Sequence, residues 1–109
     1  MAIKANLIVD QGTDYETVIN VTDDDGNIVD LTVYTADAQM RKHYTSVTYY
    51  TFTTSINIAK GTVALSLTSN TSNRIPAGRY VYDCELTDAN NKRSRLVEGI
   101  VTITPQVTR

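Results

Sequence analysis

Acidic residues that could hold a metal ion are densest in the run Asp23-Asp24-Asp25-Gly26. Hard cations such as Ca²⁺ prefer clustered carboxylates, and an EF-hand loop also contains an invariant glycine. When Gly26 is aligned with that glycine, Val21 occupies the first ligand position and Thr32 stands where a bidentate glutamate belongs, so the EF-hand pattern fails. We therefore interpret the run as a solvated hairpin tip, with a weak Ca²⁺ site on this loop as the alternative.

A second kind of chemistry would need Cys84 and His43 as a thiolate–imidazole pair. Such a pair requires an exposed thiol in electropositive surroundings and a base within hydrogen-bond reach. Cys84 lies between Asp83 and Glu85 in an alternating segment, which predicts a buried, inert thiol, and His43 is expected at a solvated strand end. With one cysteine and one histidine, the sequence excludes disulfides within the chain, CxxC motifs and multi-histidine zinc sites.

No glycine-rich phosphate loop and no Gly-x-Ser-x-Gly elbow occurs in the sequence. General acid–base catalysis needs a paired site, and none emerges from the spacing of the carboxylates. We therefore expect no catalytic residue, no cofactor, no small-molecule substrate and no enzymatic activity.

Basic residues form two small groups, Arg41-Lys42 and Lys92-Arg93 with Arg95, which could make a phosphate patch if they met in space. The formal net charge is −2, which gives no bulk attraction to nucleic acid or to an anionic membrane. We expect these residues to form an ordinary polar rim, with neither nucleic acid nor membrane as a partner.

Aromatic residues are densest at Tyr44, Tyr49, Tyr50 and Phe52. Alternation along a strand places Tyr50 and Phe52 on the face opposite Tyr49. Because aromatic anchors are enriched in protein interfaces, this segment is the predicted contact surface, and packing in the core is the alternative. The apolar segment at residues 3–9, with Ile3 and Leu7, is a second predicted contact, since an edge strand can pair with a neighbouring subunit.

The elements that must position these side chains are β-strands. Threonine occurs 17 times, mixed with valine, isoleucine and tyrosine, a bias typical of pleated, half-buried strands. Val63, Leu65 and Leu67 alternate with small or polar residues, and Tyr80, Tyr82, Cys84 and Leu86 repeat the pattern. Further strands are expected at residues 3–9, 16–22, 28–33, 36–42, 47–54 and 95–104.

Turn residues separate these strands. Polar hairpins are expected at residues 23–27 and 88–92, a turn at Gly61, and a bulge at Gly99, where the alternation changes phase. A helical turn is expected within residues 69–75, capped by Ser69 or Thr71 and ended by Pro76.

Residues 75–84 place a turn directly before a late strand that starts with tyrosine. Immunoglobulin-type sandwiches fix this corner with a hydrogen bond from the tyrosine hydroxyl to the backbone, so Tyr80 or Tyr82 is the candidate tyrosine corner. The chain lacks the second cysteine and the tryptophan of true immunoglobulin domains, so the likeness is one of architecture.

The 109 residues amount to one domain. The predicted fold is all-β, a single immunoglobulin-like antiparallel β-sandwich of about 7–9 strands over residues 1–109. The apolar stretch at the N-terminus is shorter than a signal peptide core or a membrane span, so we expect a protein made without export.

The order of these segments along the chain resembles that of a known group of proteins. Residues 14–21, the Asp-Gly turn with residues 30–32, residues 36–42, 61–67, 75–83 and 96–103 follow one another as in small structural proteins of tailed phages. The chain resembles the N-terminal β-sandwich of siphophage baseplate upper proteins and short structural proteins of marine contractile-tailed phages. It departs from the baseplate upper proteins in lacking their larger C-terminal part.

The resemblance implies a non-enzymatic component of the head, neck, tail or baseplate, made in the host cytoplasm and assembled into the virion. Its partners would be other virion proteins and copies of itself. A carbohydrate- or surface-binding β-sandwich that uses Tyr44, Tyr49 and Tyr50 is the alternative function.

Overall fold

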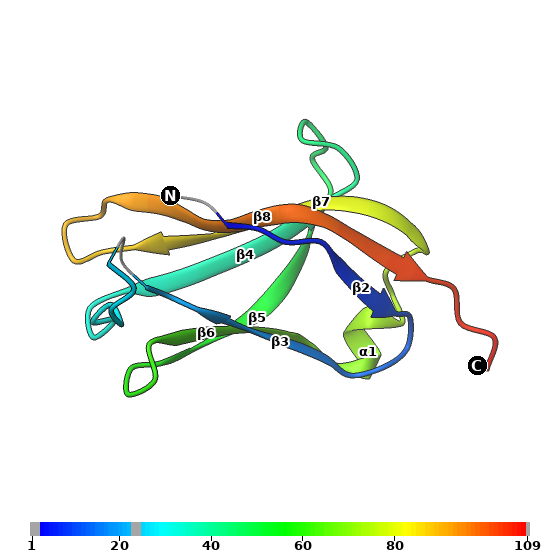
Figure 1. The fold of residues 1–109 in the computed structure, drawn as a ribbon. Helices are drawn as coiled ribbons and strands as arrows, with labels where there is room; N and C mark the ends of the chain where they lie inside the picture. Colours follow the sequence, from blue (N-terminus) through cyan, green and yellow to red (C-terminus); the bar gives the residue numbers. More distant parts are fainter. Residues whose placement is uncertain (1–2, 23–24, 109) are drawn as a thin grey trace.

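Strands form where β-branched and aromatic residues alternate with polar ones, so that every second side chain enters the core. The computed structural model describes residues 3–22 and 25–108. Its strands are β1 (Ile3–Lys4), β2 (Leu7–Asp10), β3 (Tyr15–Asn20), β4 (Thr35–Arg41), β5 (Tyr50–Asn57), β6 (Thr62–Leu67), β7 (Gly78–Thr87) and β8 (Arg93–Thr104), with helix α1 (Ser69–Ser72) between β6 and β7 (Figure 1).

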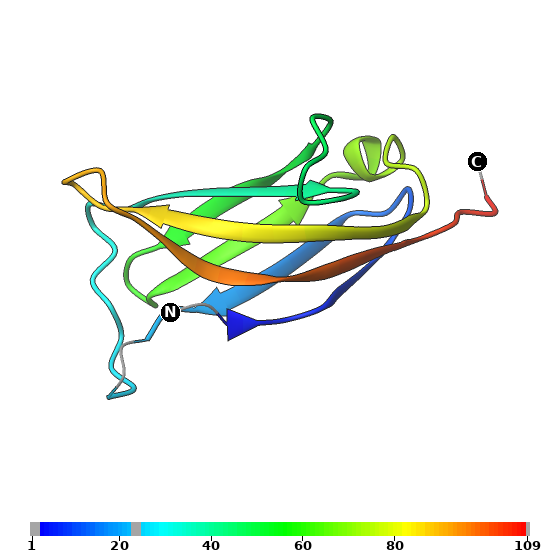
Figure 2. The ribbon, with the colours of Figure 1, turned by 90° about the horizontal axis from the view of Figure 1, so that it is seen from above.

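The eight strands form one mixed, strongly curled sheet in the order β1-β8-β7-β4-β5-β6-β3, in which β2 also pairs with β8. The sheet bends at β5, because Tyr50 and Phe52 pair with β4 whereas Thr53–Asn57 pairs with β6. Seen from above, β7 and β8 cross over β5, β6 and β3 at an angle (Figure 2). The result is a half-barrel of strands.

The all-β prediction is confirmed, but the prediction of a purely antiparallel sheet is wrong. The segments β1 and β2 pair with β8 in parallel, from Ile3↔Val97 to Asp10↔Thr104. Because β5 belongs to both halves, the strands form a continuous curled sheet instead of two clearly separate ones.

The core lies inside the curl. Its largest fully buried side chains are Phe52, Leu31, Met40, Leu65, Ile75, Ile103, Val9, Val63, Val97 and Val101. Strands β6 and β7 bury every second residue along most of their length, and in β7 these residues are Tyr80, Tyr82, Cys84 and Leu86. The predicted buried face of β7 is therefore confirmed.

Residues 28–33 do not form the predicted strand. Ile28 forms an isolated bridge with Thr22, and only Leu31 enters the core. The Asp30 carboxylate accepts a hydrogen bond from the backbone N–H of Thr32, and this local bond competes with strand pairing. The predicted hairpin tip includes Asp23 and Asp24, which lie outside the described residues.

The predicted bulge falls at another residue. The β7–β8 register shifts between Cys84↔Val97 and Glu85↔Arg95, so Leu96 is the extra residue and Gly99 pairs regularly with Tyr82. Leu96 and Val97 are both buried, which marks the change of phase. Gly99 serves a different purpose, because a Cβ atom there would lie 2.1 Å from the carbonyl oxygen of Ala5.

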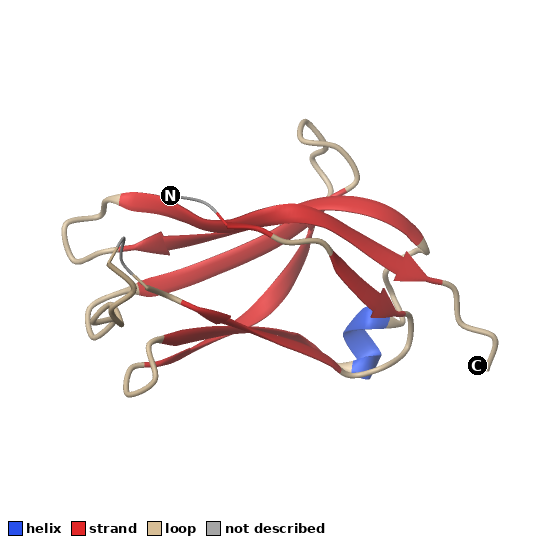
Figure 3. Cartoon of the chain, viewed as in Figure 1, coloured by secondary structure: helices blue, strands red, loops and turns tan. Residues whose placement is uncertain are grey.

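Helix α1 is shorter than the expected turn and is capped one residue earlier, at Thr68. The hydroxyl of the buried Ser72 donates to the carbonyl of Thr13 at 2.7 Å, and Asp14 accepts from the N–H of Ser69. These bonds tie α1 to the β2–β3 turn. The helix lies beside this turn in Figure 3. The hairpin at residues 88–92 is confirmed, with the Asp88 N–H donating to the Lys92 carbonyl.

Candidate functional site

The most prominent surface feature is the loop of residues 42–49, which connects β4 to β5 and projects from the body of the domain (Figure 1). Tyr44 and Val47 are 83% and 90% exposed, and Tyr49 is also exposed. Exposed aliphatic and aromatic side chains that gather on one surface, as these three do in one loop, are of the kind that partners bury at interfaces. We call residues 42–49 the β4–β5 loop and treat it as the candidate contact site.

Local polar contacts hold the base of the β4–β5 loop. The N–H of His43 donates to the hydroxyl of Ser46, and the N–H of Ser46 donates to the carbonyl of His43. The Arg41 guanidinium donates to the carbonyl of Ser46 at 2.5 Å and lies 4.8 Å from the ring centre of Tyr49. Tyr44 and Val47 therefore project from a turn that hydrogen bonds and the Arg41–Tyr49 contact hold in place.

A groove of about 520 Å³ lies at the foot of this loop, between it and the turn before β7. Its aromatic wall is Tyr50 packed edge-on against Tyr80, with ring centres 6.0 Å apart. The ammonium of Lys42 lies 5.0 Å from the centre of the Tyr80 ring. The groove adds partly buried apolar surface beside the exposed loop residues; its lining is Lys42, Ser46, Val47, Thr48, Tyr50, Pro76, Ala77 and Tyr80.

The structure divides the predicted aromatic cluster. Tyr44 and Tyr49 are exposed on the loop, and Tyr50 is half-buried at the start of β5. Phe52 is 1% exposed and packs against Tyr82 in the core, so it cannot belong to a contact surface. Pairing with β4 turns Phe52 inward, and for this residue the core interpretation holds.

The two candidate corner tyrosines both donate hydrogen bonds to backbone carbonyls. The Tyr80 hydroxyl donates to the carbonyl of Pro76 at 2.6 Å, four residues earlier, which is the bond expected of a tyrosine corner. The Tyr82 hydroxyl donates to the carbonyl of Ala5 at 2.7 Å, and burial raises the Tyr82 pKa to about 12. Tyr80 therefore joins β7 to its preceding turn, and Tyr82 joins β7 to the N-terminal segment.

The predicted N-terminal contact residues pair within the chain. Ile3 lies in β1 and Leu7 in β2, and both strands lie along β8. Ile3 is 47% exposed and Leu7 is half-buried. The side of this segment that faces away from β8 is the one a neighbour could approach.

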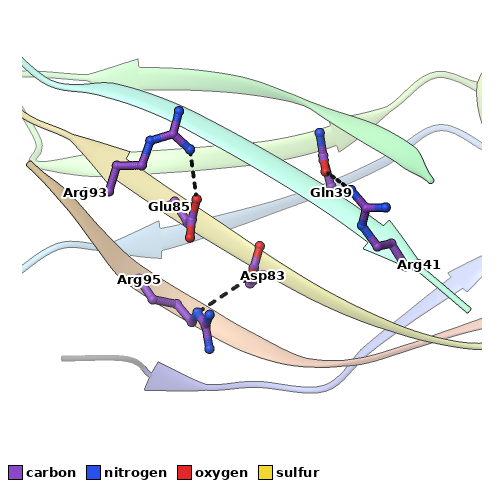
Figure 4. A network of polar contacts seen from close by, with 6 residues as sticks. All are labelled: Gln39, Arg41, Asp83, Glu85, Arg93 and Arg95. Carbon is purple, nitrogen blue, oxygen red and sulfur yellow. Dashed lines mark hydrogen bonds and ion pairs between the residues drawn. The ribbon is translucent and has the colours of Figure 1, made fainter. Parts of the chain in front are cut away.

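Sequence reasoning missed a polar network on the outer face of β4, β7 and β8 (Figure 4). Arg93 pairs with Glu85 at 3.2 Å, and Arg95 lies 3.5 Å from Asp83 and 3.6 Å from Glu98. Partial burial raises the pKa of Asp83, and repulsion from Glu85 raises it further. Opposite charges at every second position of two hairpin strands were the signal that could have revealed the network.

A hollow of about 230 Å³ opens on this network, with Tyr44 at its rim. The predicted basic groups do not merge into a phosphate patch, because Arg93 and Arg95 are paired with carboxylates. Arg41 donates to Gln39 at 3.1 Å at the other end of β4. These contacts make the outer face a mixed-charge surface.

The remaining candidate chemistry is separated in space. Cys84 is fully buried in β7, where burial and then the neighbouring carboxylates raise its pKa to about 12. His43 is exposed in the β4–β5 loop, so the two do not form a pair. Within residues 3–22 and 25–108, no three His, Cys, Asp or Glu side chains gather as a metal site.

Across the described part of the chain, no helix has the length and apolar character needed to cross a membrane.

Comparison with known proteins gives a likeness of fold. No family model matches the chain, and no curated protein matches it in sequence. Among solved structures, the internalin-like protein lmo2027 of Listeria monocytogenes is similar, with a TM-score of 0.52 and 12% identity. The match covers 94% of this chain and 28% of that chain, so this chain spans less than a third of that protein's length. At this identity the similarity shows that this chain shares its fold with a part of that protein.

Proposed function

We propose that this protein is a non-enzymatic structural component of a tailed-phage virion that acts through protein–protein contacts. The observation that carries the contact function is the β4–β5 loop, whose Tyr44 and Val47 are 83% and 90% exposed. The order of segments that resembles small phage structural proteins supports the virion assignment. The protein would be made in the host cytoplasm and bind other virion proteins and copies of itself.

We also infer that the half-barrel is a variant of the immunoglobulin-like sandwich. In that fold strands C, F and G are neighbours in one sheet, and strands B and E are neighbours in the other. Here β4, β7 and β8 are neighbours in the order β8-β7-β4, and β3 pairs with β6. The Tyr80–Pro76 hydrogen bond at the start of β7 further supports the relation.

A carbohydrate-binding module would need aromatic rings with an open face for stacking on sugars. The guanidinium of Arg41 covers one face of Tyr49, and Tyr50 is half-buried against Tyr80. Of the three tyrosines that the alternative needs, Tyr44 alone stands fully clear of such contacts among the described residues. The arrangement therefore favours a protein contact.

Immunogold electron microscopy tests the virion assignment. An antibody raised against the recombinant domain is applied to purified tailed-phage particles that carry the gene. Label at one fixed place on the particle would establish a virion component. Absence of label from intact particles, with the protein present in infected cells, would overturn the assignment.

A pair of matched variants tests the contact site. Val47→Ser on the β4–β5 loop is expected to reduce incorporation into particles, whereas Val107→Ser, at 92% exposure, is the control and leaves it unchanged. Both changes are on exposed side chains, so the urea midpoint should stay the same for both. Equal incorporation of the two variants would show that the β4–β5 loop is not part of the interface. Specific binding of the domain on a glycan array would favour the carbohydrate-binding alternative.

A further inference from the structure

The strand β3 is an edge whose second side is open. Its six residues pair with β6 without interruption from Tyr15↔Leu67 to Asn20↔Thr62, and no other strand pairs with it in the described part of the chain. The N–H and C=O groups on that free side point away from β6 and can pair with another strand.

Natural proteins usually protect such an edge with lysine, proline, a bulge or a charge that points inward. Strand β3 contains neither lysine nor proline, its register has no bulge, and its one charged residue, Glu16, is on the exposed face. The inward positions are taken by uncharged residues, among them Thr17 and Ile19. Apart from the single carboxylate of Glu16, strand β3 therefore lacks the common obstacles to strand addition.

The core is also incompletely covered along this edge. The inward residues Thr17 and Ile19 are only half-buried, whereas Val63 and Leu65 on the adjacent β6 are fully buried. On the opposite side of the opening, Ala5 and Leu7 are half-buried as well. An additional strand beside β3 would cover apolar surface that the chain leaves in contact with water.

A groove of about 300 Å³ lies between β3 and the segment of β1 and β2. We call it the β3 groove, and its lining contains no charged residue; the lining residues are Ile3, Ala5, Leu7, Thr17, Val18, Ile19, Asn20, Tyr82 and Val97. Uncharged walls favour an uncharged occupant, because burying an unpaired charge there would be costly.

The N-terminal segment is held away from β3 by its own contacts with β7 and β8. The Ala5 N–H donates to the carbonyl of Glu98, and the Ala5 carbonyl accepts from the Tyr82 hydroxyl. Asn6 accepts from the N–H of Ile100 through its side chain. These bonds keep the groove open instead of letting the segment close it.

We propose that the β3 groove accepts an extended segment of a partner protein, which adds a strand to the free side of β3. The backbone groups of β3 define the occupant as a β-strand, and the groove selects uncharged residues with aliphatic side chains at every second position. The inference concerns a surface separate from the β4–β5 loop and does not rest on the phage assignment.

A phage-displayed library of random linear peptides, selected on the immobilised domain, tests the proposal. The selected peptides should be uncharged with alternating aliphatic residues. Thr17→Lys places a charge in the groove and should weaken peptide binding by at least about tenfold. The control is Thr53→Lys, the same change at an exposed position of β5, which should leave binding unchanged.

Amide hydrogen exchange supplies a readout that does not depend on a variant. Peptide binding to the wild-type domain should slow exchange at residues 16–20 of β3. Peptides that bind Thr17→Lys as tightly as the wild type, or that leave β3 exchange unchanged, would overturn the proposal. The variant Val18→Cys tests for a second copy of the chain in the groove, with the exposed Ile8→Cys as control. A disulfide-linked dimer that forms with Val18→Cys but not with Ile8→Cys would identify a second copy as the occupant and would also overturn the proposal of a partner protein.

Discussion

Tyr80 and Tyr82 are residues of the same type that connect β7 to two different parts of the chain. Both rings are buried on the inner face of β7, and both hydroxyls reach a backbone carbonyl. Tyr80 closes a local turn at Pro76, which is exposed to solvent. Tyr82 instead connects to Ala5, which is half-buried and distant in sequence.

We expect Tyr82→Phe to lower the free energy of unfolding more than Tyr80→Phe. Water can replace the lost donor at the exposed Pro76, whereas the Ala5 carbonyl lies in a half-buried position. The cost should be about 1–3 kcal/mol for Tyr82→Phe and about 1 kcal/mol or less for Tyr80→Phe. Urea unfolding measures both, with the exposed Tyr44→Phe as control, and the reverse order would contradict this explanation.

At the scale of elements, β8 joins the N-terminal segment to the rest of the sheet, because it pairs with β7 on one side and with β1 and β2 on the other. Gly99 lets the backbone of Ala5 approach it closely. The Leu96 bulge changes which residues of β8 face the core. The change of phase that was expected at Gly99 therefore occurs at Leu96, and Gly99 instead permits the close approach of Ala5.

Gly99→Ala is expected to destabilise the domain by about 1–3 kcal/mol, since the added methyl group meets a backbone carbonyl that cannot move freely. Amide exchange should show the loss as faster exchange at Ala5, whose N–H donates to Glu98. Ser94→Ala, at an exposed position of the same strand, is the control. An unchanged urea midpoint for Gly99→Ala would show that β1 can shift without cost.

The alternation of apolar and polar residues was enough to predict the strands that bury every second residue, including β6 and β7. It failed at residues 28–33, where a side-chain bond of Asp30 sets the local conformation and only Leu31 is buried. The parallel pairing of β2 with β8 was beyond sequence reasoning, because it joins residues about as far apart as the chain allows. The cluster of aromatic residues was visible in the sequence, but residues 47–49 lie in a loop and not in the strand predicted over residues 47–54, which begins at Tyr50. The burial of Phe52 depended on pairing with β4.

The whole molecule combines a well-packed interior with two open features, the β4–β5 loop and the β3 groove. Three ionisable side chains of β7 are buried in its interior, Tyr80, Tyr82 and Cys84, and burial raises the pKa of all three. The two with the largest shifts are Cys84 and Tyr82. Burial raises the pKa of each to about 12. Their ordinary values are 9.0 and 10.0, so the unfolded chain loses these protons first as pH rises.

Global stability should therefore be constant with respect to these two groups below pH 9 and fall as pH rises toward 12. Urea midpoints measured across this alkaline range test the prediction. Cys84→Ala should make the decline shallower, because one of the two groups is gone. A midpoint that stays level up to pH 12 would contradict the burial of both groups.

The pairing of β2 with β8 also has a consequence for synthesis. Leu7 leaves the ribosome well before Val101, which is its partner in the sheet. The strands from β3 to β7 can find their neighbours while translation continues, but the N-terminal segment lacks its native partner strand until β8 has emerged. During that interval the apolar residues of β2 lack the strand that covers their backbone in the folded domain, so we expect this segment to be the last part of the sheet to gain its partner.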